Sequence, residues 1–268
     1  MWGQVLLVGW IAVFALASVI SFFATPLIAV AAQHPDFSGI WIPAPGQARA
    51  SGFGGAPKDL PFTEEGKRRV DEYQKLIGPE RANPGAYCVD YGVPTMMRSP
   101  GSYPLEFIQK PDQLTIILET EGETRRIYLG DRRVPPERRL LSRDGYSEGR
   151  WEGKTLVVKT TDLLDGVDQT SNPHSENATI EERFSIEKGK DNAPLMLYTA
   201  EITDPMFYTK PFKFDLKFVI LKDGFIFPYR CPDEFWYKLL DARRKQLREG
   251  KPVTAKMSDI YKAREAKE

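Results

Sequence analysis

The sequence predicts a mainly β protein whose strands form a single antiparallel β-barrel, with a β-sandwich as the alternative. The chain has 21 glycines and 21 prolines among 268 residues, which indicates many turns and argues against a helical bundle. Over residues 212–218, apolar side chains alternate with charged ones, as in Phe212-Lys-Phe-Asp-Leu-Lys-Phe218. A strand of this kind has one solvent-exposed face and one buried face, which is typical of an antiparallel sheet.

Short apolar segments separated by turn signals continue along most of the chain. Glu152-Gly153 is one such signal, and it predicts a tight turn between paired strands. We expect strands over residues 37–41, 105–109, 113–119, 124–129, 146–151, 154–160, 178–187, 195–203, 212–221 and 225–230. Apolar residues at helical spacing predict helices over residues 63–77 and 233–249, and we also expect a short third helix from Ser258. Few helices and many short connections favour a barrel over an α/β fold.

The first 31 residues contain no charged side chain and end in Ala29-Val30-Ala31. An apolar core followed by a small-x-small motif predicts a secretory signal peptide, cleaved to leave Ala32 as the new N-terminus. The alternative is a single membrane anchor, because the apolar run is long enough to cross a bilayer. In both cases we expect the body of the protein outside the cytoplasm, either periplasmic or secreted. The predicted organisation is an export segment (1–31), a β-barrel domain (32–232) and a C-terminal helical extension (233–268).

The charge balance and the motifs restrict the partners. With 37 basic and 37 acidic residues the formal net charge is zero, so we expect no binding to nucleic acid. The sequence contains no P-loop, no G-x-G-x-x-G, no C-x-x-C and no H-x-x-x-H, so we expect no cofactor and no metal site. Membrane contact is expected only through an uncleaved N-terminal segment. The two cysteines, Cys88 and Cys231, predict a disulfide in an oxidising compartment, with two buried thiols as the alternative.

His174 is the first candidate catalytic residue, and it lies in the polar loop Asp168-Gln-Thr-Ser-Asn-Pro-His-Ser175. Histidine suits general acid–base chemistry because its pKa is ordinarily near neutrality. Asp168, together with Asp162 and Asp165, could orient or charge the imidazole. The alternative is a loop histidine that holds the backbone by hydrogen bonds.

Glu182 is the second candidate catalytic residue. By the period of two it shares the apolar face of its strand with Ile180 and Phe184, and a carboxylate in such surroundings must be paired, protonated or in a ligand cavity. Arg125 lies on the apolar face of another strand and could pair with Glu182, whereas Arg126 would face away. The pair is either a structural ion pair or part of a ligand site that His174 completes.

Several aromatic residues could line an apolar cavity in the barrel or belong to its core. As ligand-binding candidates we take Tyr128, Tyr146 and Trp151, together with Arg125 and Asp168. A barrel of about eight strands can hold one small ligand. The sequence therefore favours binding of a small, mainly apolar molecule. A cofactor-free lyase, isomerase, cyclase or hydrolase that uses His174 and Glu182 is the alternative, and a structural module with a filled interior is the third possibility.

Two resemblances support the β-rich interpretation. Gly39-Ile-Trp41 is similar to the Gly-x-Trp first strand of lipocalin-like barrels. From about Pro35 to Cys231 the chain resembles an uncharacterised family of secreted bacterial β-rich proteins. The runs that carry this resemblance include Asp36-Phe-Ser-Gly-Ile-Trp41, Gly149-Arg-Trp-Glu-Gly-Lys-Thr-Leu-Val-Val158, Pro173-His-Ser175 and Glu182-Arg-Phe184. The family pattern has Asp at the position of Lys154 and His at that of Tyr146. The resemblance implies export and a β fold but supplies no activity.

Overall fold

A computed structural model describes residues 34–46, 59–76, 89–98, 103–168, 172–229, 231–256 and 258–259. Its contacts divide the chain into two compact units, residues 1–33 and residues 34–268. The first unit contains the predicted export segment and lies outside the described residues.

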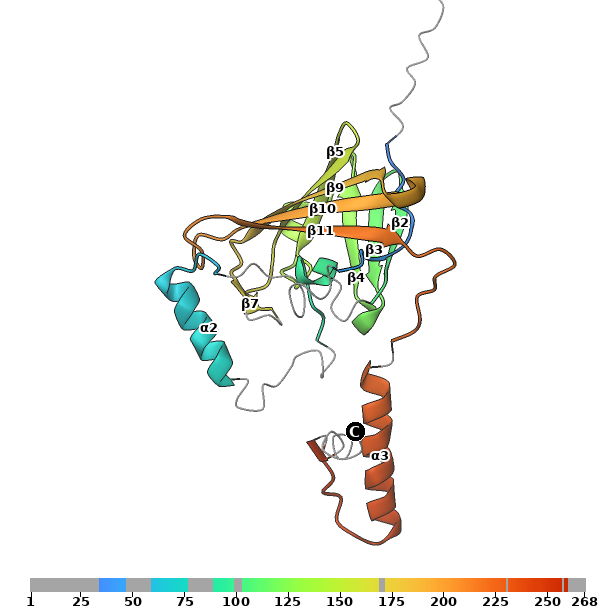
Figure 1. The fold of residues 1–268 in the computed structure, drawn as a ribbon. Helices are drawn as coiled ribbons and strands as arrows, with labels where there is room; N and C mark the ends of the chain where they lie inside the picture. Colours follow the sequence, from blue (N-terminus) through green and yellow to red (C-terminus); the bar gives the residue numbers. More distant parts are fainter. Residues whose placement is uncertain are drawn as a thin grey trace, which may run out of the picture. The chain divides into compact units, whose positions relative to one another are not determined.

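The predicted barrel is confirmed: nine strands form one closed sheet (Figure 1). Around the barrel the order is β1-β11-β10-β9-β6-β5-β4-β3-β2, so most neighbours in space are also neighbours in sequence. A separate two-stranded sheet is formed by β7 (Gly166–Val167) and β8 (Pro173–His174). The barrel strands are β1 (Gly39–Pro43), β2 (Leu105–Lys110), β3 (Gln113–Leu118), β4 (Thr124–Leu129), β5 (Tyr146–Glu152), β6 (Thr155–Thr161), β9 (Thr179–Lys188), β10 (Pro194–Thr203) and β11 (Phe212–Ile220).

One neighbouring pair in the barrel is parallel, which differs from the predicted all-antiparallel sheet. Strands β4 and β5 run in the same direction, with Ile127 opposite Ser147, and every other pair is antiparallel. A ring of nine strands cannot alternate in direction all the way round, so at least one pair must be parallel. The long connection from Gly130 to Gly145 makes this possible, because parallel strands need a crossover rather than a tight turn.

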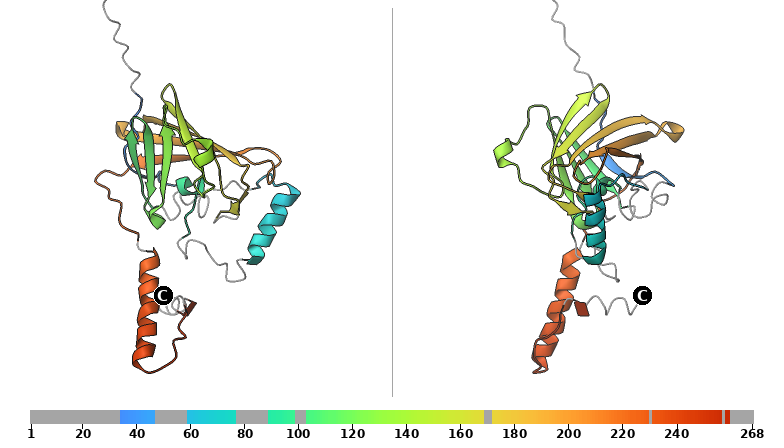
Figure 2. Two further views of the ribbon diagram at one scale, coloured as in Figure 1. Left: turned by 180° about the vertical axis from the view of Figure 1, so that it is seen from behind. Right: turned by 90° about the vertical axis from the view of Figure 1, so that its left-hand side faces the viewer.

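The predicted last strand, residues 225–230, is wrong: its described part, up to Tyr229, contains no strand. The edge of β11 that it would need is occupied by β1, where Trp41 pairs with Ile220. The other edge of β1 pairs with β2 through Trp41 and Leu105, which closes the sheet. No edge remains free in a closed barrel, and Pro228 lacks the N–H that a ladder needs. The views in Figure 2 show the strands around the closed sheet.

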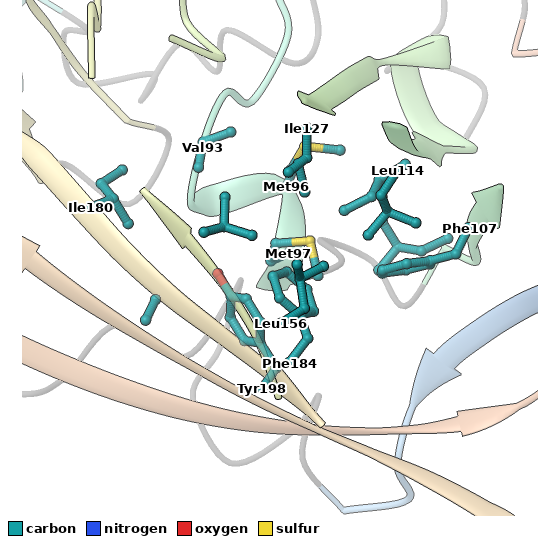
Figure 3. Packing of buried hydrophobic residues seen from close by; sticks show 14 of the residues in the cluster. Val93, Met96, Met97, Phe107, Leu114, Ile127, Leu156, Ile180, Phe184 and Tyr198 are labelled. Atoms are coloured by element: carbon teal, nitrogen blue, oxygen red, sulfur yellow. The ribbon is translucent and has the colours of Figure 1, made fainter. Parts of the chain in front are cut away.

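A short segment before the second strand fills part of the barrel interior. Its 3₁₀ helix, Thr95–Arg98, is buried along its whole length. Met96 and Met97 are fully buried in the same cluster as Phe184 and Tyr198 (Figure 3). The pattern of strands did not predict this insertion, and it leaves the interior packed with side chains rather than open to a ligand.

Buried polar contacts fix this segment in place. The Glu123 carboxyl group accepts hydrogen bonds from the backbone nitrogens of Tyr91 (3.0 Å) and Gly92 (2.8 Å). Gly92 has φ +71°, and a Cβ at this position would lie 2.6 Å from the Arg143 carbonyl oxygen. Only glycine therefore fits the turn that leads into the 3₁₀ helix.

The described residues also form two α-helices besides the barrel strands. Helix α2 (Glu64–Leu76) begins after Thr63, whose hydroxyl accepts a hydrogen bond from the Gly66 nitrogen at 3.0 Å, as an N-cap does. Helix α3 (Cys231–Arg248) matches the predicted C-terminal helix. Ser258 and Asp259 are helical, and the rest of the predicted third helix lies outside the described residues. None of the helices described here combines the length and apolar character needed to cross a bilayer.

The predicted Cys88–Cys231 disulfide lies outside the part of the chain whose side chains are described, and it stays a prediction. We expect mass spectrometry of the native, non-reduced protein to find no alkylatable thiol, because exported proteins with two cysteines tend to pair them. Breaking the bridge should lower the free energy of unfolding by about 2–5 kcal/mol. Two thiols that react before reduction would contradict the prediction.

Candidate functional site

Five neighbouring strands each contribute one inward polar residue to a network in the barrel. Arg125 comes from β4, Ser147 from β5, Thr160 from β6, Glu182 from β9 and Tyr198 from β10. All five are buried, and Glu182 is fully buried. The period-two alternation predicted the inward positions of Glu182 and Arg125, and both are confirmed.

The Arg125 guanidinium and the Glu182 carboxylate form a bidentate ion pair. Arg125 Nη1 donates to Glu182 Oε1 at 2.8 Å, and Nη2 donates to Oε2. The remaining donors of Arg125 contact the Ser147 and Thr160 hydroxyls at 2.9–3.2 Å. The Tyr198 hydroxyl donates to Glu182 Oε1 at 2.8 Å. Burial, and then the charge of Glu182, raise the pKa of Tyr198 well above 10, so this hydroxyl keeps its proton.

These contacts make the pair a structural part of the core. Both Glu182 oxygens have donors, as a buried carboxylate requires. Neither Arg125 nor Glu182 lines the cavity that contains His174. The structure therefore does not bring the two predicted catalytic residues, His174 and Glu182, together in one site.

His174 lies instead in a cavity of about 30 Å³ at one end of the barrel. Its walls come from the segment before the 3₁₀ helix, from the β7–β8 sheet and from the adjoining ends of β10 and β11. The lining residues are Tyr91, Val93, Pro94, Thr95, Arg98, Asp168, Asn172, Pro173, His174, Ile202, Tyr208, Phe212 and Phe214. Most are apolar, and a few polar groups converge among them, which is the composition of a small-molecule site.

Asp168 organises the polar side of this cavity. Its carboxylate accepts hydrogen bonds from Arg98 Nη2 at 2.7 Å, from the Thr95 hydroxyl at 2.9 Å and from the Asn172 backbone nitrogen at 2.9 Å. The side chains of Arg98 and Asp168 are only 3% and 8% exposed. Asp168 therefore ties the β7–β8 sheet to the 3₁₀ helix that is inserted in the barrel.

The position of His174 is set by its two neighbours in sequence. The Pro173 carbonyl oxygen accepts a hydrogen bond from the Tyr208 hydroxyl at 2.8 Å. Ser175 donates to the buried Asp204 carboxylate through its backbone nitrogen (2.7 Å) and through its hydroxyl (2.9 Å). The chain on both sides of His174 is thus anchored to the turn that follows β10, and the imidazole is held against the cavity.

The imidazole of His174 is largely removed from water. Burial lowers its pKa below the ordinary value of 6.5, against the opposing charges of Asp168, Asp165 and Asp204. Near neutral pH the ring is therefore uncharged, with one nitrogen that donates and one that accepts. Its Nδ1 atom is buried and has no hydrogen-bond partner among the residues that the structure describes.

The three predicted aromatic ligand residues lie away from this cavity. Tyr128 and Tyr146 stack at 5.4 Å on the outer side of the wall, and the Arg139 guanidinium covers the Tyr146 ring at 3.8 Å. The predicted cavity-facing position of these two tyrosines is therefore wrong, because they occupy the strand face opposite to Arg125 and Ser147.

Trp151 lies near the opposite end of the barrel. The strand pairings align Trp151 of β5 with Leu156 of β6, and Leu156 with Phe184 of β9. Ile202, which lines the His174 cavity, pairs instead with Ile180, nearer the start of β9. Trp151 lines a separate open hollow together with His34. It therefore does not share a site with His174.

Several residues of the cavity could not be predicted from the sequence, among them Arg98, Tyr208 and Phe212. Arg98 carries no sequence signal, because its role depends on a long-range ion pair with Asp168. Tyr208 lies in a turn with no periodic pattern, and Phe212 was recognised only as part of the alternating strand 212–218.

Comparisons with known proteins add no assignment to this geometry. No protein-family model matches the chain, and none of the curated proteins matches it.

Proposed function

We propose that this protein binds a small, mainly apolar molecule that places one uncharged polar group against His174 in the cavity at the barrel end. The observation that carries the proposal is the buried Nδ1 atom of His174, which has no partner among the described residues and belongs to a residue that lines a largely apolar cavity. A buried polar atom without a partner costs about 1–3 kcal/mol. A ligand hydroxyl or carbonyl group could remove this cost.

The packing of the barrel supports this place for the ligand over the barrel centre. The interior is occupied by the core and by Met96 and Met97. The end cavity has apolar walls that include Ile202, Phe212 and Phe214. Its volume of about 30 Å³ exceeds the roughly 10–15 Å³ that one water needs, but it cannot enclose a whole ligand. The polar end of the molecule would enter, and its apolar part would cover the mouth.

The state of the imidazole restricts the chemistry of the ligand. Because the lowered pKa of His174 keeps the ring neutral, the cavity favours a neutral hydrogen-bonding group over a carboxylate or an amine. The Arg98–Asp168 pair compensates its own charges within the cavity wall. Together with the proposed export, this describes a binding protein that acts outside the cytoplasm.

Catalysis is the second candidate, because a neutral, buried imidazole can also accept a proton. Glu182 cannot be its partner, since its carboxylate is bound by Arg125 and Tyr198. An enzyme at this site would use His174 with Asp168. Formation of a product from a bound molecule, abolished by His174→Ala, would distinguish this candidate from simple binding.

The proposal is tested with small neutral alcohols as probes: phenol, benzyl alcohol and cyclohexanol. We expect at least one of them to bind in a calorimetric titration. Ile202→Trp, which fills the cavity, should abolish binding. His174→Ala should weaken it about fivefold, the value of one hydrogen bond of about 1 kcal/mol. His34→Ala is the matched control and should bind as the wild type does. No binding of any probe, or unchanged binding by Ile202→Trp, would contradict the proposed site.

A further inference from the structure

The connection between β4 and β5, residues 130–145, presents leucine side chains to the solvent. Leu140 is 82% exposed and Leu141 is 44% exposed. Leu164 is 41% exposed and lies on the adjoining segment, because its backbone nitrogen donates to the Ser142 carbonyl oxygen at 2.8 Å. We call Leu140, Leu141 and Leu164 the leucine patch. Exposed apolar residues that lie together mark an interaction site, whereas scattered single ones do not.

Hydrogen bonds on both sides of the two consecutive leucines fix the shape of this connection. Before them, Arg139 lies over the Tyr146 ring at 3.8 Å, and its Nε atom donates to the Val134 carbonyl oxygen at 2.9 Å. After them, the Ser142 nitrogen donates to the Asp162 carbonyl oxygen at 3.2 Å. The right-hand view of Figure 2 shows the short 3₁₀ helix of the connection standing out from the barrel wall. The leucines are therefore held in an exposed position.

Arginines flank the leucine patch. Arg138 precedes Leu140 by two positions, and Arg143 follows Leu141 by two positions. Both arginines are exposed, and neither forms an ion pair with another residue that the structure describes. The whole connection contains five arginines and three acidic residues. The surface around the leucines therefore offers positive charge to an anionic partner.

The leucine patch lies beside the His174 cavity. The Arg143 carbonyl oxygen accepts a hydrogen bond at 3.1 Å from the nitrogen of Val93, which lines that cavity. Leu164 leads into β7, where a Cβ added to Gly166 would lie 3.6 Å from the His174 ring. A partner bound at the patch would therefore meet the protein next to the cavity.

We infer that the leucine patch docks the protein on a lipid bilayer that contains anionic lipids. The leucine side chains enter the region between headgroups and acyl chains, and Arg138 and Arg143 contact the phosphates. The sequence predicted membrane contact only through the N-terminal segment, and the patch adds a second surface. Docking does not depend on the proposed function, but it would bring the His174 cavity to a phase in which apolar molecules dissolve.

A bilayer suits this surface better than a protein partner does. Stable protein interfaces bury about 800 Å² on each side and depend on large anchor residues that fill pockets. The leucine patch instead belongs to a connection that stands out from the barrel wall and offers three aliphatic side chains between arginines. Shallow insertion into a bilayer needs only apolar side chains and nearby basic residues.

The test uses the full chain and vesicles with brominated acyl chains, because bromine quenches the fluorescence of a tryptophan that it contacts. The vesicles contain phosphatidylglycerol and phosphatidylcholine in equal parts, or phosphatidylcholine alone. We expect the tryptophan introduced by Leu140→Trp, measured against the wild type, to be quenched by the anionic vesicles and several-fold less by the neutral ones. Leu76→Trp is the matched control, because Leu76 is 76% exposed but lies on α2, and its tryptophan should not be quenched. Both variants contain the same N-terminal segment, so its own contact with lipid cancels in the comparison.

The contribution of the arginines is tested in the Leu140→Trp background. One arginine near an anionic surface changes the ratio of docked to undocked protein about fivefold, so Arg138→Gln and Arg143→Gln together should lower this ratio roughly 25-fold. Lys154→Gln is the matched control. It removes an exposed positive charge from the turn between β5 and β6, at the opposite end of β5 from Tyr146, and should leave the quenching unchanged.

Equal quenching at positions 140 and 76, or equal quenching by anionic and neutral vesicles, would overturn the inference. An unquenched tryptophan at position 140, together with binding of polyglutamate, would overturn it in favour of an acidic protein partner. The alcohol titration is made without lipid, so failure of the docking surface and failure of the proposed function can be told apart.

Discussion

Replacing Arg125 by alanine is expected to lower the free energy of unfolding by about 3–5 kcal/mol, because it leaves a buried charge without a partner. Glu182 is fully buried and receives two hydrogen bonds from Arg125. The variant would keep the bond from Tyr198 but lose the guanidinium that is bonded to the carboxylate. Urea denaturation monitored by circular dichroism measures the effect.

Arg126→Ala is the matched control on the same strand. Arg126 is exposed, on the opposite face of β4 from Arg125, so its loss should change stability by no more than about 0.5 kcal/mol. Similar destabilisation by the two variants would contradict the buried network. The double replacement Arg125→Met with Glu182→Leu should recover much of the lost stability, since it removes both charges together. Glu182→Gln should likewise affect stability rather than the binding of an alcohol.

Stability is expected to fall as the pH rises from 6 to 9, through a buried pair of carboxyl groups. Glu123 is 3% exposed, and its carboxyl group interacts with that of Asp144, an interaction that is favourable only if the pair holds a proton. Burial, and then the charge of Asp144, raise the pKa of Glu123 to about 9. Asp90 adds negative charge near Asp144, and Arg125 adds positive charge.

The sign follows from proton linkage. A carboxyl group whose pKa is higher in the folded state binds its proton more tightly there. Its contribution to stability is fully present below the unfolded pKa of about 4.5 and is lost as the pH rises towards 9. Each pKa unit corresponds to about 1.4 kcal/mol, so we expect a loss of about 4 kcal/mol between pH 6 and pH 9.

The variant Asp144→Asn tests whether loss of a proton from the Glu123–Asp144 pair causes the fall in stability. The introduced amide can donate a hydrogen bond to Glu123 without a proton from solvent. Its stability should match the wild type near pH 5 and exceed it by several kcal/mol at pH 9, in urea titrations repeated across the range. Asp90→Asn is the control, since it removes a neighbouring charge but no hydrogen bond to Glu123, and it should retain the wild-type slope. Parallel pH profiles for the wild type and Asp144→Asn would show that the pair holds no shared proton.

The strands could be predicted because their signal is local. Alternation over residues 212–218 and around Glu182 depends only on which face of the strand is buried. The positions of most strands and the Arg125–Glu182 pair could therefore be predicted from it. The end of the series could not be predicted locally. Residues 225–229 have strand-like composition, and only the closure of the barrel by β1 denies them a partner. The parallel β4–β5 pair is likewise a property of the whole ring.

The candidate site could be predicted only in part. His174 stood out by its chemistry, and Asp168 by its place upstream in the same loop, and both line the cavity. The opposite wall comes from Val93 and Arg98, in a segment whose burial has no periodic pattern and results from its insertion into the barrel. His174 and Glu182 were expected to share a site, but the structure separates them. Their separation arises because β9 carries Glu182 into a network that is already complete.

Because the chain has only two histidines, one NMR measurement can test whether a ligand binds in the His174 cavity. Nitrogen-15 NMR of the imidazole rings during titration with the alcohol that binds best reports His174 and His34 separately. We predict that the Nδ1 resonance of His174 shifts on binding at pH 7, from a neutral ring, while the signals of His34 near the other end of the barrel stay unchanged. An unmoved His174 resonance at saturating alcohol, or equal shifts at both histidines, would contradict a ligand site in the cavity.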